Sequence, residues 1–367
     1  MVLRIQKKEF LNALSTGGSV AGQSKVMSIL DCVKFVVEGG IMCVSSYDME
    51  TMASTTANVE NVGGGTGSFC APIKDILPSV KSVSDEVFDI VVDNNMLRIV
   101  HSKGQIEFPC QSAEEFPVPV SNYPDSSVTV KSSVLFDIIG SARSFVANDT
   151  VRLVLCGIGI KLQRGLVEFA ATDGRVLFVD KVKCEYDGEE CSAIIPVKAI
   201  NSIMSVINGT DDATIMIGSD NVTVSSENGS VKTRCIEGRF PNYNAVIPQN
   251  NQNTAEADKN DIISSVRRVV LSSNAATKAV SFHFGGVSIE MRSEDFDMCK
   301  RANDVCLCSY AGEPVTIGLS SQMFLDSLSA VKSSNVLMRL GNESTPMLIK
   351  DAENKNRTIL IMPIRIV

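Results

Sequence analysis

Apolar residues recur at helical spacing in six stretches of the chain, and the segments between them alternate apolar and polar positions. This pattern predicts helices at 5–22, 73–83, 132–146, 197–207, 259–272 and 321–331. Strands are predicted at 33–37, 41–46 and 49–56 after the first helix, and at 88–92, 96–101 and 105–110 after the second. The same order of helix, strands, helix and strands then follows twice more.

A proline-containing corner closes each of three successive segments. The pairs are Phe116-Pro117, Phe240-Pro241 and Met362-Pro363, and their prolines lie 124 and 122 residues apart. Proline fixes φ and cannot donate to a sheet ladder, so a recurring proline marks a recurring corner. Predicted turns keep nearly the same offset: Asp48, Asp173 and Asp295; Asn94, Asp220 and Asn342; Gly104, Gly229 and Asn354.

A repeat of about 125 residues is too long for a solenoid and is better interpreted as a domain. We predict an α+β protein of three domains, 1–121, 122–247 and 248–367, each with two helices against mostly antiparallel strands. Three similar domains in a row form an arc. Heterologous contacts between arcs either close into a ring or continue as a filament.

Basic residues on the predicted helices would line one face of such an arc. They are Lys8, Lys74, Lys81, Arg143, Lys198, Arg267, Arg268 and Lys332. The alternative for each is an ordinary solvated surface charge. The net charge of −8 predicts no long-range attraction to nucleic acid, although it allows a locally basic face.

Composition indicates a cytoplasmic protein. The first residues carry charges where a signal peptide needs an apolar core, and no apolar run reaches the roughly 20 residues that span a membrane. The 11 cysteines are therefore interpreted as reduced thiols. Cys306 with Cys308, and Cys184 with Cys191, lack the CxxC spacing of structural zinc, so no metal site is predicted.

No catalytic constellation stands out in the sequence. There is no GxSxG, no HExxH and no glycine-rich loop followed by Lys and Ser or Thr. The glycines at 63–65 are typical of a flexible loop. Asp173 with Glu168 could form an acid/base pair, but an Asp before a Gly is explained more simply as a turn. We therefore predict no catalytic residue and no cofactor.

Three segments resemble those of one known family, the bacterial sliding clamps, which are the β subunit of DNA polymerase III. Residues 171–177 (ATDGRVL) are similar to its ATDGHRL segment, and residues 238–248 (GRFPNYNAVIP) to its GRFPDYxxVxP segment. Residues 360–366 (LIMPIRI) resemble its VMPMRL ending. The three occur in the family's order, and the resemblance covers the whole chain.

The resemblance implies three domains of the DNA clamp fold, with helices lining the inner face and antiparallel sheets outside. Two chains would form a ring-shaped, head-to-tail homodimer around double-stranded DNA. Such a ring holds DNA topologically and slides, because phosphate contacts carry no sequence information. The implied partners are the replicative polymerase, the clamp loader and repair proteins, bound through short linear peptides, with no membrane involved.

The family's peptide pocket lies between its second and third domains, and its apolar residues take Leu and Phe side chains of the peptide. The resemblance places it here at Leu155, Thr172, Gly174, Arg175, Leu177, Pro241, Val246, Ser320, Met323, Met362, Pro363, Ile364 and Arg365. For each apolar member the alternative is plain core packing. The chain departs from the family at Arg175-Val176, Ala245, Ser320 and Met323, so its peptide preference is expected to differ.

The resemblance also implies a dimer interface made by Ile106 and Phe108 of one subunit and Val270 and Leu271 of the other. On this basis Ile106→Asp or Phe108→Asp should give monomers. Two other hypotheses are an enzyme of unknown reaction on a triplicated α+β scaffold and a structural surface repeat protein. The missing catalytic residues disfavour the first, and the free cysteines without a signal peptide disfavour the second.

Overall fold

The computed structural model describes residues 1–22, 27–119 and 125–366. The chain packs into two compact units, one of Met1–Asp137 with Cys184–Glu237 and one of Ile138–Lys183 with Gly238–Val367. The middle of the three predicted domains is thus divided between the units. Its predicted start at 121/122 lies outside the described residues, so the three domain boundaries remain predictions. No described helix has the length and apolar character needed to cross a bilayer.

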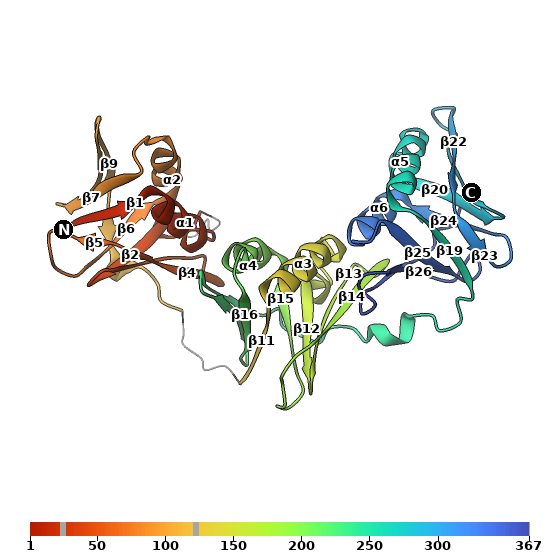
Figure 1. Cartoon of the computed structure of the whole chain (residues 1–367), viewed down its shortest axis with the longest axis horizontal. Coiled ribbons are helices and arrows are strands. Elements are labelled where there is room, and N and C mark those ends of the chain that lie inside the picture. Colours follow the sequence, from red (N-terminus) through yellow and green to blue (C-terminus); the bar gives the residue numbers. More distant parts are fainter. Residues whose placement is uncertain (23–26, 120–124, 367) are drawn as a thin grey trace. The chain divides into compact units, whose positions relative to one another are not determined.

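The first unit contains a five-stranded sheet in the order β5-β1-β7-β8-β9 and a nine-stranded sheet in the order β10-β6-β2-β3-β4-β18-β17-β16-β11. Helices α1 and α2 lie beside one another in it (Figure 1). Its helices are α1 (Lys7–Gly17), α2 (Ile73–Ser82) and α4 (Ile200–Ile207), with 3-10 turns η1 (Ser28–Asp31), η2 (Ala113–Glu115) and η5 (Val197–Ala199). Its strands are β1 (Val2–Gln6), β2 (Cys32–Glu38), β3 (Ile41–Tyr47), β4 (Thr51–Asn58), β5 (Glu60–Asn61), β6 (Gly67–Pro72), β7 (Val87–Asp93), β8 (Met96–His101), β9 (Gly104–Pro109), β10 (Gln111–Ser112), β11 (Ser126–Lys131), β15 (Cys191–Pro196), β16 (Asp212–Ile217), β17 (Asn221–Ser226) and β18 (Gly229–Arg234).

The second unit contains a four-stranded sheet in the order β22-β21-β20-β24 and a larger sheet that includes β12-β13-β14-β27-β26-β25-β19-β23. Its helices are α5 (Lys259–Val269) and α6 (Ser321–Ser329), with 3-10 turns η3 (Arg143–Phe145), η4 (Leu153–Leu155), η6 (Tyr243–Val246) and η7 (Val270–Ser272); the chain enters it within α3 (Ser132–Ala142). Its strands are β12 (Gly157–Gln163), β13 (Leu166–Thr172), β14 (Val176–Lys183), β19 (Asn253–Asp258), β20 (Ala279–Gly285), β21 (Ser288–Asp295), β22 (Lys300–Leu307), β23 (Ser309–Ala311), β24 (Val315–Ser320), β25 (Asn335–Leu340), β26 (Met347–Asp351) and β27 (Thr358–Ile361).

The repeat predicted from the prolines is present and is itself double. Each of its three copies runs twice through one strand, one helix and three strands, as in β1-α1-β2-β3-β4 followed by β6-α2-β7-β8-β9. All strand pairs with a recorded register are antiparallel, for example β4 with β18 and β14 with β27. The class is therefore α+β, as the alternating pattern predicted.

Local sequence explains where the helices begin and end. In α5 the carboxylate of Asp258 accepts a hydrogen bond from the Asp261 backbone N–H, which caps the first turn. Ile262, Val266 and Val269 then form one buried stripe at helical spacing. In α1 the prediction of a helix from residue 5 was wrong, because residues 2–6 alternate buried and exposed positions and form β1.

A fully buried ion pair fastens β14 to β27 in the second unit. Nε of Arg357 lies 2.7 Å from Oδ2 of Asp180, and both side chains are 1% exposed. The guanidinium also donates to the Ala330 carbonyl oxygen at 2.6 Å and lies 5.1 Å from the ring centroid of Phe178. Because each charge is met inside the protein, loss of one partner would leave the other buried and uncompensated.

Candidate functional site

A tight turn at residues 172–175 forms the first element of the predicted peptide pocket. The Thr172 hydroxyl donates to the Val176 carbonyl oxygen at 2.5 Å and accepts from the Gly174 N–H at 3.0 Å. The Asp173 carboxylate accepts from the N–H groups of Arg175 and Val176 at 2.7 and 2.8 Å. Gly174 has φ of 90°, a conformation that favours glycine. Asp173 is therefore a turn residue, not half of an acid/base pair with Glu168.

The C-terminal tail is tied down on both sides of Pro363. The Met362 N–H donates to the carbonyl oxygen of Arg175 at 2.8 Å, and the Ile364 N–H donates to the carbonyl oxygen of Gly318 at 2.8 Å. A Cβ on Gly318 would lie 2.4 Å from both the Ile364 carbonyl oxygen and Cγ1 of Ile366. Only glycine lets the tail cross strand β24 this closely.

A hydrogen-bonded carboxylate holds the linker that carries Pro241 and Val246. Glu168 is 7% exposed and accepts from the Tyr243 hydroxyl at 2.6 Å and from Lys181 Nζ at 2.9 Å. Burial opposes ionisation of Glu168, but these hydrogen bonds outweigh it and lower the pKa of its carboxyl group. Burial and the neighbouring carboxylate raise the pKa of the Tyr243 phenol. This ring therefore remains a neutral donor to Glu168.

Apolar side chains beneath the linker form a small cluster separate from the main cores. It contains Ala170, Leu177, Val179, Leu348 and Leu360, with Phe240, Tyr243 and Ile247 packed against it. Of the predicted apolar pocket residues, Leu155 and Leu177 are only 6% and 3% exposed, whereas Val246 is 53% and Met362 38% exposed. The exposed pair offers side-chain surface to a ligand. The buried pair supports the site from below.

Five of the predicted pocket residues line one cavity of about 950 Å³ in the second unit, namely Arg175, Ser320, Met323, Ile364 and Arg365. Thr172 and Gly174 belong to the turn that carries Arg175, and a backbone hydrogen bond joins Met362 of the tail to that turn. Pro241 and Val246 are placed only through their linker, which packs over the Leu177 cluster. The cavity continues over β20 and β21 to residues that the sequence did not indicate, including Arg292 and Phe296.

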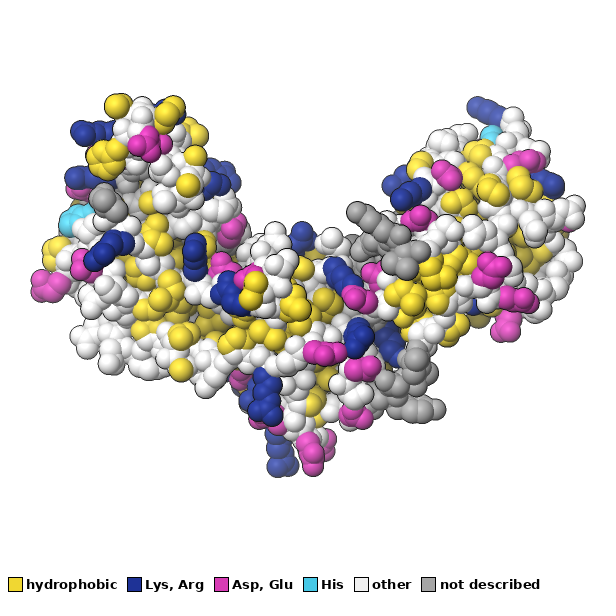
Figure 2. Space-filling model, turned by 180° about the vertical axis from the view of Figure 1, so that it is seen from behind, with side chains coloured by type: hydrophobic (Ala, Val, Ile, Leu, Met, Phe, Trp, Pro, Cys, Tyr) yellow, Lys and Arg dark blue, Asp and Glu magenta, His cyan; other side chains and the backbone are white. Residues whose placement is uncertain are grey.

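The predicted DNA-facing residues are all exposed, but their surroundings differ. Lys198 is paired with Glu50 and lies 3.8 Å from Asp48, Arg268 is paired with Asp304, and Lys74 lies 3.7 Å from Asp31. Arg143 and Lys332 also have interactions. Within the described part of the chain, no ion pair is recorded for Lys8, Lys81 or Arg267. Figure 2 shows basic and acidic side chains interspersed on the face it displays.

The predicted dimer residues require one correction. Ile106 and Phe108 do share a face of β9, but that face packs on the core of the first unit, and Phe108 is 6% exposed. Phe108→Asp would therefore bury a charge in the core, so it cannot serve as an interface test. Leu271 is 77% exposed and Val270 is partly buried, and their place at an interface stays a prediction. Among the residues that the structure describes, β9 and β22 are each the last strand of their sheet, so the outer edge of each pairs with no further strand there.

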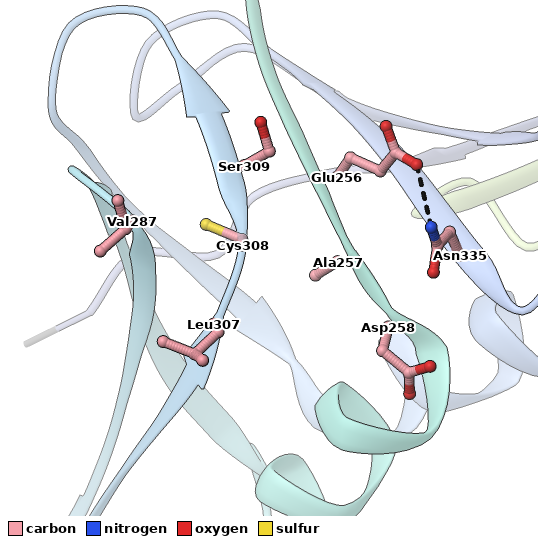
Figure 3. Close-up of a pocket in the computed structure, with 8 residues that line it drawn as sticks. All are labelled: Glu256, Ala257, Asp258, Val287, Leu307, Cys308, Ser309 and Asn335. Atoms are coloured by element: carbon pink, nitrogen blue, oxygen red, sulfur yellow. Dashed lines mark hydrogen bonds between the residues drawn. The ribbon is translucent and has the colours of Figure 1, made fainter.

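A second cavity of about 680 Å³ opens where β22 diverges from β19 (Figure 3). Val287 and Leu307 contribute exposed apolar side chains on one side, 73% and 74% exposed. On the other side Nδ2 of Asn335 donates to Glu256 at 3.1 Å. Exposed apolar residues thus accompany the free edge of β22.

No group of three or more His, Cys, Asp or Glu side chains suited to a metal ion occurs among the described residues. Burial raises the pKa of the thiols of the buried Cys32, Cys70 and Cys306, and for Cys306 it raises the pKa to about 11. Thiols of this kind are poor nucleophiles at neutral pH.

Gly318, Glu168 and Lys181 shape the site and were not predicted as site residues. A signal existed for Gly318, because an isolated glycine inside a strand pattern indicates a close backbone approach. Nothing in the sequence could have found Glu168 or Lys181, since their importance depends on Tyr243 folding back onto β13 and β14.

Comparison with known proteins matches all three copies. Models of the DNA polymerase III beta subunit match residues 1–121 (N-terminal domain), 129–242 (central domain) and 244–365 (C-terminal domain). The chain is 24% identical over 369 residues to the beta sliding clamp of Haemophilus influenzae, covering 100% of both chains. It is also 24% identical over 378 residues to that of Rickettsia bellii, covering 99% of each.

Solved structures agree with the sequence matches. The sliding clamp of Pseudomonas aeruginosa bound to griselimycin has a TM-score of 0.95 at 20% identity, with 100% of both chains covered. DNA polymerase III beta subunit from Thermotoga maritima has a TM-score of 0.92 at 20% identity, again with 100% of both chains covered. The fold is therefore shared along the whole length.

Proposed function

Because this chain belongs to the DNA polymerase III beta subunit family and is a DNA sliding clamp, we propose that two copies close head to tail into a ring around duplex DNA. The ring tethers the replicative polymerase for processive synthesis and catalyses no reaction itself. We further propose that it works in the cytoplasm. The alternative of an enzyme on a triplicated scaffold has no support, since the matched relatives are clamps.

The observation that supports the dimer is that β9 and β22 each end a sheet, whereas the equivalent strands of the other half-copies pair with one another. Within the chain, β4 pairs with β18 in the first unit and β14 pairs with β27 in the second. In both junctions, the last strand of one half-copy pairs with the last strand of another. β22 and β9 occupy these two positions in the remaining half-copies, and both have free edges. Pairing β22 of one chain with β9 of another therefore repeats a junction that the chain already makes twice.

The register of this intermolecular pair follows from the internal junctions. In the first unit Met52 lies opposite Lys232, and Ala53 opposite Val231. Arg301 is the equivalent of Met52, because each pairs across its hairpin with the residue just before the turn aspartate, Tyr47 with Met52 and Glu294 with Arg301. Glu107 is the equivalent of Lys232, because each lies three residues after the glycine of its hairpin turn, Gly104 and Gly229.

Transferring this register pairs Arg301 with Glu107 and Ala302 with Ile106 across the dimer. A basic and an acidic side chain then face one another, and two half-buried apolar side chains meet on the core side. Ile106 thus keeps a role at the interface, although it also packs on its own core. The exposed Leu271 and Leu307 supply further apolar surface nearby.

For DNA, we propose that Lys8, Lys81 and Arg267 make phosphate contacts. They are exposed, and no carboxylate partner is recorded for them within the described residues. Lys198 and Arg268 are already paired with carboxylates of the chain, so we expect them to contribute less to DNA binding. Contacts of this kind give attraction that weakens with salt and carries no sequence information.

For partners, we propose that peptides of the polymerase, clamp loader and repair proteins bind at the 172–175 turn, the linker and the C-terminal tail. Val246, Met323, Met362 and Ile364 offer apolar surface, while Arg175 and Arg365 lie at the cavity. Extended peptides commonly dock by a few apolar anchors in such sites.

Light scattering after size exclusion tests the dimer. A single species of about twice 39.5 kDa at micromolar concentration is expected. A monomer at that concentration would contradict the pairing of β22 with β9.

A further inference from the structure

The cavity that is lined by five of the predicted peptide-site residues continues well beyond them. From Arg175, Met323 and Ile364 it extends across the outer face of the small sheet to Arg292 on β21 and to Phe296 at the following hairpin. Space of about 950 Å³ exceeds what one or two apolar anchors fill. The added part is distinct in chemistry from the linker side of the site.

Positive charge dominates the lining of this cavity. Arg175, Lys278, Arg292 and Arg365 line it, against the single carboxylate of Glu294. Glu294 is itself met by Arg301, at 3.3 Å. Arg292 reaches Glu290 at 2.9 Å with its side chain 68% exposed, so the contact is screened and exchangeable.

This local excess of cations stands out because the protein as a whole has a formal charge of −8. The same lining also offers apolar surface, since Phe296 is 67% and Ile366 44% exposed. A ligand that complements both must carry apolar and acidic groups on one short chain. Duplex DNA supplies no such apolar groups, whereas a peptide does.

We propose that the cavity binds acidic residues that flank the apolar anchors of the partner's peptide. The inference rests on the proposed peptide site and specifies its ligand: Asp or Glu next to the Leu and Phe anchors. Arg292 and Lys278 receive the flanking carboxylates, and Phe296 covers the backbone between anchor and flank. Partners with such a flank are then favoured over partners without one.

The test uses fluorescein-labelled peptides that share a Leu-Phe anchor and carry three Asp or three Ser, before or after it. Anisotropy titrations on the full-length protein should show tighter binding of one Asp-flanked peptide, on the order of fivefold. Arg292→Gln should reduce this preference. Lys355→Gln is the matched control, since it removes an exposed positive charge outside the cavity and should leave the preference unchanged.

Other outcomes overturn the proposal in distinguishable ways. Equal affinity for Asp-flanked and Ser-flanked peptides in both positions refutes the preference for acidic flanks but is compatible with the proposed peptide site. An equal loss of preference in Arg292→Gln and Lys355→Gln indicates general electrostatic attraction. Binding of the Asp-flanked peptide after Leu and Phe are replaced by Ala indicates an anion site independent of anchors. Failure of all peptides to bind removes the peptide site itself.

Discussion

Reversing the charges at the proposed intermolecular pair provides the sharpest test of the dimer register. Glu107→Arg places two guanidinium groups opposite one another, and Arg301→Glu places two carboxylates there. Combining both changes restores an attractive pair with its ends exchanged. Within one chain Glu107 contacts Arg98 at 3.1 Å and Arg301 contacts Glu294 at 3.3 Å, so each reversal also turns an attractive contact of the single chain into a like-charge one, in monomer and dimer alike.

The magnitude follows from exposure and symmetry. A cross-strand charge pair contributes about 0.2–1 kcal/mol, and like charges cost a similar amount. A two-chain ring contains the junction twice, so a single reversal changes the dimer by about 0.8–4 kcal/mol on these values. Because the side chains are 42% and 77% exposed, the lower half of that range applies. About 1–2 kcal/mol corresponds to a dissociation constant raised about five- to thirtyfold.

Sedimentation or mass photometry over a dilution series measures the dissociation constant of the wild type and each variant. Both single variants should weaken the dimer, and the double variant should recover most of the loss. Glu114→Arg is the control, because it makes the same charge change at an exposed position outside β9. If the loss of dimerisation free energy in the double variant equals the sum of the losses in the two single variants, the two side chains do not face one another and the register is wrong.

Three further predictions concern the architecture of the site. Gly318→Ala should displace the tail and weaken peptide binding by anisotropy while the circular dichroism spectrum is retained; unchanged affinity would show that the tail's path does not matter. Glu168→Gln should lower stability at neutral pH by loosening the hold on Tyr243. Because the pKa of Glu168 is lowered on folding, this difference is full well above about pH 4.5 and disappears as the pH falls through the folded pKa, and thermal melts from pH 3 to 7 that run parallel would refute it. Arg357→Met should cost about 3–5 kcal/mol by removing the positive charge that faces the buried Asp180 carboxylate, which keeps only neutral donors such as the Asn354 amide; the loss is seen as a lower urea midpoint, and a variant as stable as the wild type would show that Asp180 is relieved by water or protonation.

Much of the fold could be predicted because its signals are local. The sequence of each helix has apolar residues at helical spacing, followed by turn residues. Asp48, Asp173 and Asp295 mark equivalent hairpins. The hydrogen bonds explain this signal, since each carboxylate caps its turn by accepting a backbone N–H three residues on. A repeated turn with the same chemistry survives where most other residues have changed.

What could not be predicted depends on sheet neighbours distant in sequence. Alternation in β9 shows that Ile106 and Phe108 share a face, but only the packed sheet shows that this face is the core. From the sequence alone, Arg357 is indistinguishable from a surface cation. Only the pairing of β14 with β27 shows that it lies buried beside Asp180. The positions of β9 and β22 at the ends of their sheets likewise appear only once the strand order of those sheets is known.

Topological retention on DNA tests the central claim most directly. The protein is loaded onto a nicked circular duplex with a clamp loader and ATP, freed from loader by gel filtration, and the circle is then cut once by a restriction enzyme. The ring account predicts that the protein stays with the intact circle in moderate salt and leaves within minutes of linearisation. Retention on the linear DNA equal to that on the circle would contradict encirclement and indicate ordinary affinity instead.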